Sequence, residues 1–203
     1  MIYEFGRFAT KIGAAPLVAA GIASFMKEPE SLGALLGAWI TEFGELNEVQ
    51  TLRAFESYED FRQERDRAIT STNPFHSAAH LVQFSLEPHQ IFSFIEAPKL
   101  GKFGPIYEIR SYELQPNGLV PMLESWEVAT PARLAVSPMI IAAYSLEGVP
   151  RFTHIWAYAS LEQRSQLRAE AVKTGIWPPK GGPTYLANMR SSICLPTAFS
   201  PLG

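Results

Sequence analysis

Cysteine, surplus positive charge and long apolar runs are all scarce in this sequence. Its one cysteine, Cys194, cannot form a disulfide within the chain or build a cysteine-based zinc site. A formal net charge of −3 argues against the basic surface with which proteins bind nucleic acids. The mostly apolar stretch from Ile12 to Met26 is shorter than the roughly 18–20 residues that cross a membrane. We therefore expect a globular, cytoplasmic protein without a membrane span.

Motifs that would identify a known chemistry are missing as well. The chain has no glycine-rich phosphate loop, no G-x-S-x-G elbow and no cysteine cluster. His76 and His80 are four residues apart, a spacing that can place two metal ligands on one helix face. They follow the Asn73-Pro74 turn and have no carboxylate close by in sequence, so we expect a surface role for them. No metal site and no cofactor is predicted.

The most informative stretch, Arg151 to Arg164, predicts a strand that runs directly into a helix. Its first half alternates with the period of two that a strand requires. Ser160 precedes Gln163 by three residues, which is the capping-box pattern of a helix start. One strand face is small and aliphatic, and the other is aromatic with polar tips. We expect one face to pack against helices and the other to line a cavity. The aromatic face consists of Phe152, His154, Trp156 and Tyr158.

A weaker copy of this pattern occurs in the first half of the chain. Val49 to Glu59 aligns with Phe152 to Glu162, and Ile2-Tyr3-Glu4 matches Ile106-Tyr107-Glu108. The two matches are almost in register, so the chain is predicted to be a tandem duplication of two units of about 100 residues, an ordinary domain size. The predicted domains are residues 1–97 and residues 98–203.

Each unit is predicted to follow the order strand–helix–strand–strand–helix–strand. Gly44-Glu45-Leu46-Asn47 is a turn suited to a hairpin, and Ser57 is placed to cap the second helix of unit one. The order βαββαβ is that of a ferredoxin-like unit, so the predicted fold class is α+β with two such units in tandem. The predicted strands are 2–8, 36–43, 49–55, 81–86, 106–113, 139–146, 151–158 and 185–195.

Two segments resemble the NIPSNAP family. Residues 37–49 are similar to that family's W-x-x-E-x-G-x-L-N-x-V hairpin, and residues 106–112 are similar to its opening strand. The sequence departs from the family at two places, because Arg53 stands where the family has tryptophan and unit two lacks the hairpin motif. Each unit keeps a part that the other has lost, which indicates that the two units have specialised.

Unit two carries two further similarities to the family. The run from His154 to Tyr158, continued by Arg164 and Arg168, resembles its strand-to-helix segment, and residues 199–202 resemble its C-terminal signature. The resemblance implies a dimeric α/β-barrel arrangement, in which two ferredoxin-like sheets face each other across a cavity. A tandem chain would close this barrel either within itself or by exchange with a second copy. Further homo-oligomers are expected.

Strand alternation supplies a candidate site inside that barrel. If the apolar faces pack on the helices, the polar and aromatic faces point into the cavity, and a slip of one residue would invert each set. The candidate catalytic residues are His154, Glu108 and Arg110. The candidate ligand-binding residues are Tyr112, Trp156, Tyr158, Arg53, Phe55 and Trp39.

His154 is the centre of the candidate chemistry. We predict that it hydrogen-bonds Glu108, directly or through one water, and that this anion raises its pKa. In the functional interpretation His154 is a general acid or base, and Arg110 holds a carboxylate or enolate oxygen. In the alternative, His154 fills the barrel without any turnover. The resemblance leaves one more alternative, an axial haem ligand, because some relatives with this barrel bind haem.

The preferred function is binding of a small, partly aromatic or acyl ligand in the barrel cavity. The first alternative is a cofactor-independent isomerase, decarboxylase or monooxygenase that uses His154. The second is a structural or interaction module with a filled barrel. A pocket of about 300 Å³ or more, lined by His154 and Arg110, would favour a ligand or a substrate over a filled barrel.

Overall fold

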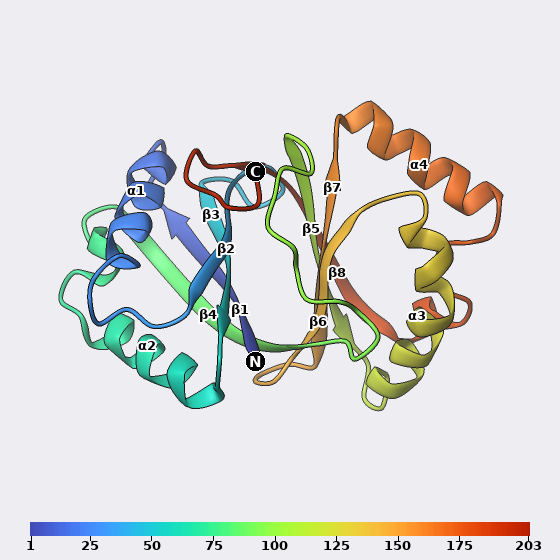
Figure 1. Cartoon of the computed structure of the whole chain (residues 1–203), viewed down its shortest axis with the longest axis horizontal. Helices are drawn as coiled ribbons and strands as arrows, with labels where there is room; N and C mark the ends of the chain where they lie inside the picture. Colours follow the sequence, from blue (N-terminus) through green and yellow to red (C-terminus); the bar gives the residue numbers. More distant parts are fainter.

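Eight antiparallel strands form a closed barrel with two helices on each of two opposite sides in the computed structural model, which describes all 203 residues (Figure 1). The βαββαβ order of both units and the predicted fold class are confirmed. The first unit consists of β1 (Ile2–Thr10), α1 (Ala15–Phe25), β2 (Ala34–Phe43), β3 (Glu48–Phe55), α2 (Tyr58–Thr70), the 3-10 turn η1 (Pro74–His76) and β4 (Leu81–Ile91). The second consists of β5 (Ile106–Leu114), α3 (Leu119–Leu134), β6 (Met139–Ser145), β7 (Arg151–Tyr158), α4 (Leu161–Lys173), the 3-10 turn η2 (Gly182–Tyr185) and β8 (Leu186–Pro196).

The barrel closes within the single chain. Its strands follow the order β1-β3-β2-β8-β5-β7-β6-β4, and β4 pairs with β1 again. Two seams join the units: Trp39 of β2 lies opposite Pro196 of β8, and His89 of β4 lies opposite Ser145 of β6. Closure uses up the open sheet edges through which a second copy could pair. Self-association would therefore have to use the outer surface.

Side-chain caps fix the start of the second helix in each unit, as predicted. Ser57 Oγ accepts the backbone N–H of Asp60 at 3.1 Å, and the Asp60 carboxylate accepts the Ser57 N–H at 3.0 Å. Ser160 Oγ accepts the backbone N–H of Gln163 at 3.0 Å. These bonds satisfy helix N–H groups that have no partner within the helix. The Ser160 cap starts α4 only two residues after the end of β7, so the helix turns back over the strands of its own sheet.

Helix α3 gains a last turn beyond Pro131, a residue type that usually ends or kinks a helix, and continues to Leu134. The added turn carries Arg133 into the interior, where it is 2% exposed. The apolar stretch noted in the sequence forms α1, and none of the helices combines the length and the hydropathy needed to cross a membrane.

Apolar side chains form three separate cores. One lies between the first sheet and helices α1 and α2, and another lies between the second sheet and helix α3, with Trp177 of the loop after α4 packed against it. The third fills one end of the barrel interior, where the rings of Trp39 and Tyr107 are 5.3 Å apart. Leu202 is buried in this third core, and its N–H donates to the carbonyl of Leu36 at 3.0 Å. The C-terminal tail thus closes that end of the barrel.

The face assignment made from the sequence is wrong for every predicted site residue except Trp39. The ring of His154 lies 4.9 Å from that of Trp126 on α3, and Arg53 donates to Glu64 on α2 at 2.8 Å, so both side chains lie under helices. The physical reason is width, because the inside of an eight-stranded barrel has room for its own side chains and at most one small ligand, not for a whole face of large aromatic rings. The small face of β7 therefore turns inward and the bulky aromatic face packs on the helices. The residues concerned are Glu108, Arg110, Tyr112, His154, Trp156, Tyr158, Arg53 and Phe55.

Candidate functional site

A pocket of about 340 Å³ lies between the second sheet and its helices. Strands β5 and β7 form its floor, α3 and α4 form its walls, and the loop after α4 covers it with Trp177 and Pro178. His154 and Arg110 both line it, so the predicted pair meets at a cavity, although this cavity is outside the barrel. Other lining residues are Tyr112, Met122, Trp126, Phe152, Arg168 and Met189.

Glu108 is fully buried at the edge of this pocket and is held by arginines. Arg164 Nη2 donates to Oε1 at 2.6 Å and its Nε donates to Oε2 at 2.9 Å, while Arg110 pairs with the same carboxylate. Ser191 Oγ adds a hydrogen bond at 2.8 Å. Burial opposes the charge of Glu108, but the Arg164 hydrogen bonds, the Arg110 cation and Ser191 outweigh it and lower its pKa to about 2. This carboxylate stays ionised and holds the arginines in place.

Positive charge exceeds negative charge around Glu108. Arg168 lies 4.0 Å from the carboxylate and makes no hydrogen bond of its own within the protein. Arg133 lies over the ring of Trp156 at 4.7 Å, and its Nε and Nη1 are buried without partners. Burial lowers the pKa of Arg133. Arg110, Arg164 and Arg168 thus pair with one carboxylate, and Arg133 is a fourth cation nearby without an ion pair of its own. Buried charge without a counter-charge is costly, so this end of the pocket favours an anion.

His154 presents a hydrogen-bond donor rather than a base. Its Nδ1 accepts the indole N–H of Trp156 at 2.6 Å, so the proton of the neutral ring is on Nε2. That Nε2 is buried and has no hydrogen-bond partner. Burial and the Arg110 cation hold the pKa of His154 well below its ordinary value, so the predicted upward shift is wrong. No direct hydrogen bond joins His154 to Glu108. Nδ1 of His154 accepts from Trp156, and the carboxylate of Glu108 accepts from Arg164.

Aromatic side chains make up most of the remaining wall. The ring of Tyr112 lies 5.1 Å from that of His154, and its hydroxyl oxygen accepts from Arg110 Nε, which leaves the O–H free to donate. Trp126 packs against Trp177 at 4.8 Å. The sequence reasoning missed Trp126 and Arg133. Their helical spacing with Met122 and Thr130, which are also buried, is the signal that could have placed them on one inward face of α3.

The donor set does not fit an axial haem ligand. Iron needs a free nitrogen lone pair, but Nδ1 of His154 is occupied by Trp156 and Nε2 carries the proton. No group of three or more His, Cys, Asp or Glu side chains gathers anywhere in the chain. His76, weighed above as a metal ligand, bonds Glu28 through Nε2 at 2.7 Å on the surface.

The predicted residues of unit one do not join this site. Arg53 is 1% exposed and uses all three of its nitrogens, with two bonds of 2.8 Å to Glu4 and one of 2.8 Å to Glu64. Phe55 packs on Phe61 of α2 with ring centroids 5.8 Å apart. The charge of Arg53 is therefore satisfied within a buried network beside the apolar core under α2, and no pocket residue comes from unit one.

A comparison of the sequence with known protein families agrees with the resemblance seen in the hairpin of unit one and in the strand-to-helix segment of unit two. The sequence profile of the NIPSNAP family matches residues 3–84 and 107–201. The chain belongs to the NIPSNAP family. The profile covers both units, so this NIPSNAP chain carries the family pattern along nearly its whole length.

Relatives of this NIPSNAP chain differ in length. Protein NipSnap homolog of Dictyostelium discoideum is 29% identical over 170 residues, which cover 79% of this chain and 74% of the relative. Protein NipSnap homolog 2 of Homo sapiens is 29% identical over 189 residues, which cover 83% of this chain and 62% of the relative. Protein NipSnap of Drosophila melanogaster is 30% identical over 147 residues, 71% of this chain and 50% of the relative. The NIPSNAP chain described here thus spans between half and three quarters of these relatives.

Solved structures share the barrel at low sequence identity. An anthrone oxidase-like protein is 10% identical with a TM-score of 0.70, and the match covers 97% of this chain and 91% of that one. A mutant chlorite dismutase from Candidatus Nitrospira defluvii is 9% identical with a TM-score of 0.58, covering 96% and 92%. At these identities the likeness concerns the fold alone.

Proposed function

We propose that the pocket of unit two binds a small organic anion, a carboxylate carried on an aromatic or acyl body. The observation that carries this proposal is the imbalance of charge, with four arginines around the single carboxylate of Glu108. An anionic ligand would neutralise part of this excess at the partly buried end of the pocket, where Arg110 is 14% exposed. The pocket volume of about 340 Å³ suits a molecule of this class.

The two ends of the pocket match the two ends of such a ligand. Arg168 and Arg110 would hold the carboxylate, since guanidinium groups pair with carboxylates in bidentate geometry. The free N–H of His154 and the O–H of Tyr112 supply further donors at the same end. The apolar body would lie against Trp126 and its neighbours on α3, where aromatic surface is available.

Binding explains the lining better than turnover does. Proton abstraction from a carbon acid needs a base, yet the pocket lining contains no aspartate or glutamate. His154 holds its proton on the nitrogen that remains free, so it would stabilise an oxygen anion instead of accepting a proton. The enzymatic alternative therefore has a donor for the oxygen anion, His154, but lacks the base that would take the proton.

Calorimetric titration with benzoate, phenylacetate and octanoate tests the proposal. We expect at least one carboxylate to bind, its neutral amide to bind at least tenfold more weakly, and added salt to weaken binding. Arg168→Gln should lower the affinity by about tenfold or more, as loss of one charged hydrogen-bonding partner predicts. Lys173→Gln is the matched control, because this cation is on the same helix and is 80% exposed. Equal binding of acids and amides would refute the proposal.

The cellular compartment of the protein is part of the same proposal. We place the protein in the cytoplasm, because its single cysteine, Cys194, leaves the fold without the internal disulfides that are common in proteins of oxidising compartments. Fractionation of cells that express the tagged chain tests this placement. Recovery of the chain mainly in a membrane or secreted fraction would contradict it.

A further inference from the structure

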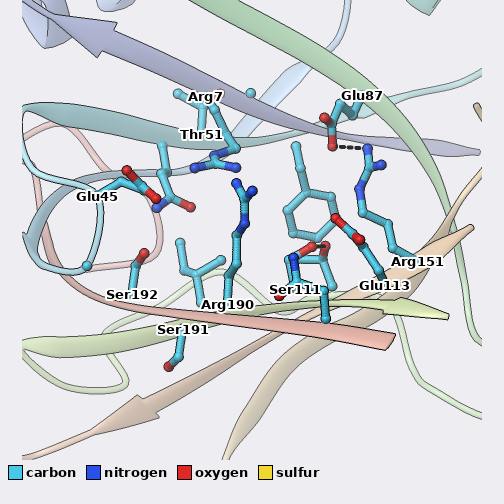
Figure 2. A pocket seen from close by; sticks show the side chains of 17 residues that line it. Arg7, Glu45, Thr51, Glu87, Ser111, Glu113, Arg151, Arg190, Ser191 and Ser192 are labelled. Atoms are coloured by element: carbon cyan, nitrogen blue, oxygen red, sulfur yellow. Dashed lines mark hydrogen bonds and ion pairs between the residues drawn. The ribbon is translucent and has the colours of Figure 1, made fainter. Parts of the chain in front are cut away.

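The barrel interior holds a second cavity of about 390 Å³ (Figure 2). It lies toward the end of the barrel opposite to Trp39, since β5 places Tyr107 in the apolar core and Glu113 at this cavity. Only Phe5 and Ile109 of its lining are hydrophobic. Both units contribute charged side chains to it, namely Arg7, Glu45, Glu87, Glu113, Arg151 and Arg190.

Two of the three arginines are neutralised by the wall itself. Arg151 pairs with Glu87, and Arg7 Nη2 bonds Glu48 Oε2 at 2.9 Å. Arg190 makes no ion pair and no side-chain hydrogen bond, and the same holds for Glu113. Glu45 at the exposed rim is a further carboxylate without a partner. The cavity thus contains free charges of both signs that do not neutralise each other.

The strand register makes this separation unexpected. Arg190 of β8 lies opposite Ser111 of β5, and Glu113 lies two residues further along β5. Diagonal neighbours of this kind are about 7–8 Å apart, within reach of long side chains. Figure 2 shows instead that Arg190 extends across the cavity toward the guanidinium group of Arg7, while Glu113 lies beside Arg151. Solvent at the exposed Arg190 and the Glu48 carboxylate on Arg7 weaken the repulsion between these two guanidinium groups, and an anion bound between them would remove more of it.

We propose that the barrel cavity binds a small zwitterion, such as an amino acid or an ω-amino carboxylate. Its carboxylate would lie between Arg7 and Arg190, and its ammonium group would meet Glu113. The polar lining suits a ligand with little apolar surface. This site is independent of the anion pocket, because Ser111 and Glu113 point into the barrel whereas the alternate residues Arg110 and Tyr112 point toward the helices.

Titration with glycine, 4-aminobutyrate and 6-aminohexanoate tests this inference, with butyrate and butylamine as single-charge references. We expect one amino carboxylate to bind at least tenfold more tightly than either reference. Arg190→Gln should weaken its binding tenfold or more, and Arg190→Lys should restore part of the loss. Glu113→Gln should remove the advantage of the amino carboxylate over butyrate. Arg168→Gln should change nothing here, which separates this site from the anion pocket.

Three outcomes would overturn the inference. The first is that butyrate binds as tightly as the best amino carboxylate, which would mean an anion site only. The second is that Glu113→Gln leaves the preference intact in a protein with unchanged thermal unfolding. The third is that no amino carboxylate binds at millimolar concentration while benzoate still binds the helix-side pocket.

Discussion

Replacing Glu108 by glutamine should destabilise the protein at neutral pH by about 2–3 kcal/mol. The Glu108 side chain is fully buried, and its pKa falls from 4.5 to about 2 in the folded protein. At about 1.4 kcal/mol for each pKa unit, that difference corresponds to roughly 3 kcal/mol. Solvent near the partly exposed Arg164 and Arg168 screens some of it. Urea denaturation followed by tryptophan fluorescence at pH 7 measures the loss.

The same substitution should also change the response to acid. A carboxylate whose pKa is lower when folded stabilises the protein above about pH 5 and loses that effect as the pH falls toward 2. The wild-type chain should therefore lose stability over this range, and Glu108→Gln should lose less, so that the two converge near pH 2–3. Glu59 is the control, because hydrogen bonds from Arg62 and Gln63 lower its pKa to about 2 although it is fully exposed. Glu59→Gln should have little effect. A difference between Glu108→Gln and wild type that stays the same at pH 7 and pH 3 would refute the reasoning.

Three further predictions concern stability, binding and assembly. Arg53→Met should cost about 3–5 kcal/mol in urea denaturation because it leaves the buried Glu4 unpaired, and an effect no larger than that of the exposed Arg62→Met would contradict this. His154→Gln should retain most of the benzoate affinity and His154→Ala should lose about tenfold, because only glutamine keeps an N–H donor, and equal losses would exclude a donor role. Residues 1–97 alone should dimerise, because the isolated unit exposes the sheet face that holds Phe5 and Leu52 and that is buried inside the barrel of the whole chain. A monomeric fragment in light scattering would count against this. The same method tests self-association of the whole chain, for which a single species of 22.5 kDa at all concentrations would be the contrary result.

Periodicity and helix caps made the secondary structure predictable. They did not predict which face of each strand points into the barrel and which points toward the helices. Ser57 and Ser160 marked helix starts because a capping side chain acts within its own turn. The face of β7 depends on what packs against it, and both of its faces are apolar enough to be buried. The inward choice followed from the width of the closed barrel, a global property that the alternation of residues 151–158 does not contain.

The candidate residues were grouped correctly within unit two for a local reason. Glu108 and Arg110 are two apart on one strand, and His154 lies opposite Arg110 on the next, so they share a face whichever way that face points. The partners from other elements were beyond reach. That Arg164 of α4 would hold Glu108, and that α3 would bring Arg133 onto the ring of Trp156, depends on helix packing that no single segment encodes.

Closure of the barrel inside one chain has a genetic consequence. In a barrel made of two identical chains, any substitution changes both halves at once, so a pocket cannot be gained on one side without being imposed on the other. Here the Arg53 network can specialise in folding while the unit-two pocket varies freely. Damaging alleles should therefore sort by position, with those in the buried Arg53 network lowering the amount of protein and those at partly exposed pocket residues such as Arg168 leaving the amount intact while altering what the protein recognises.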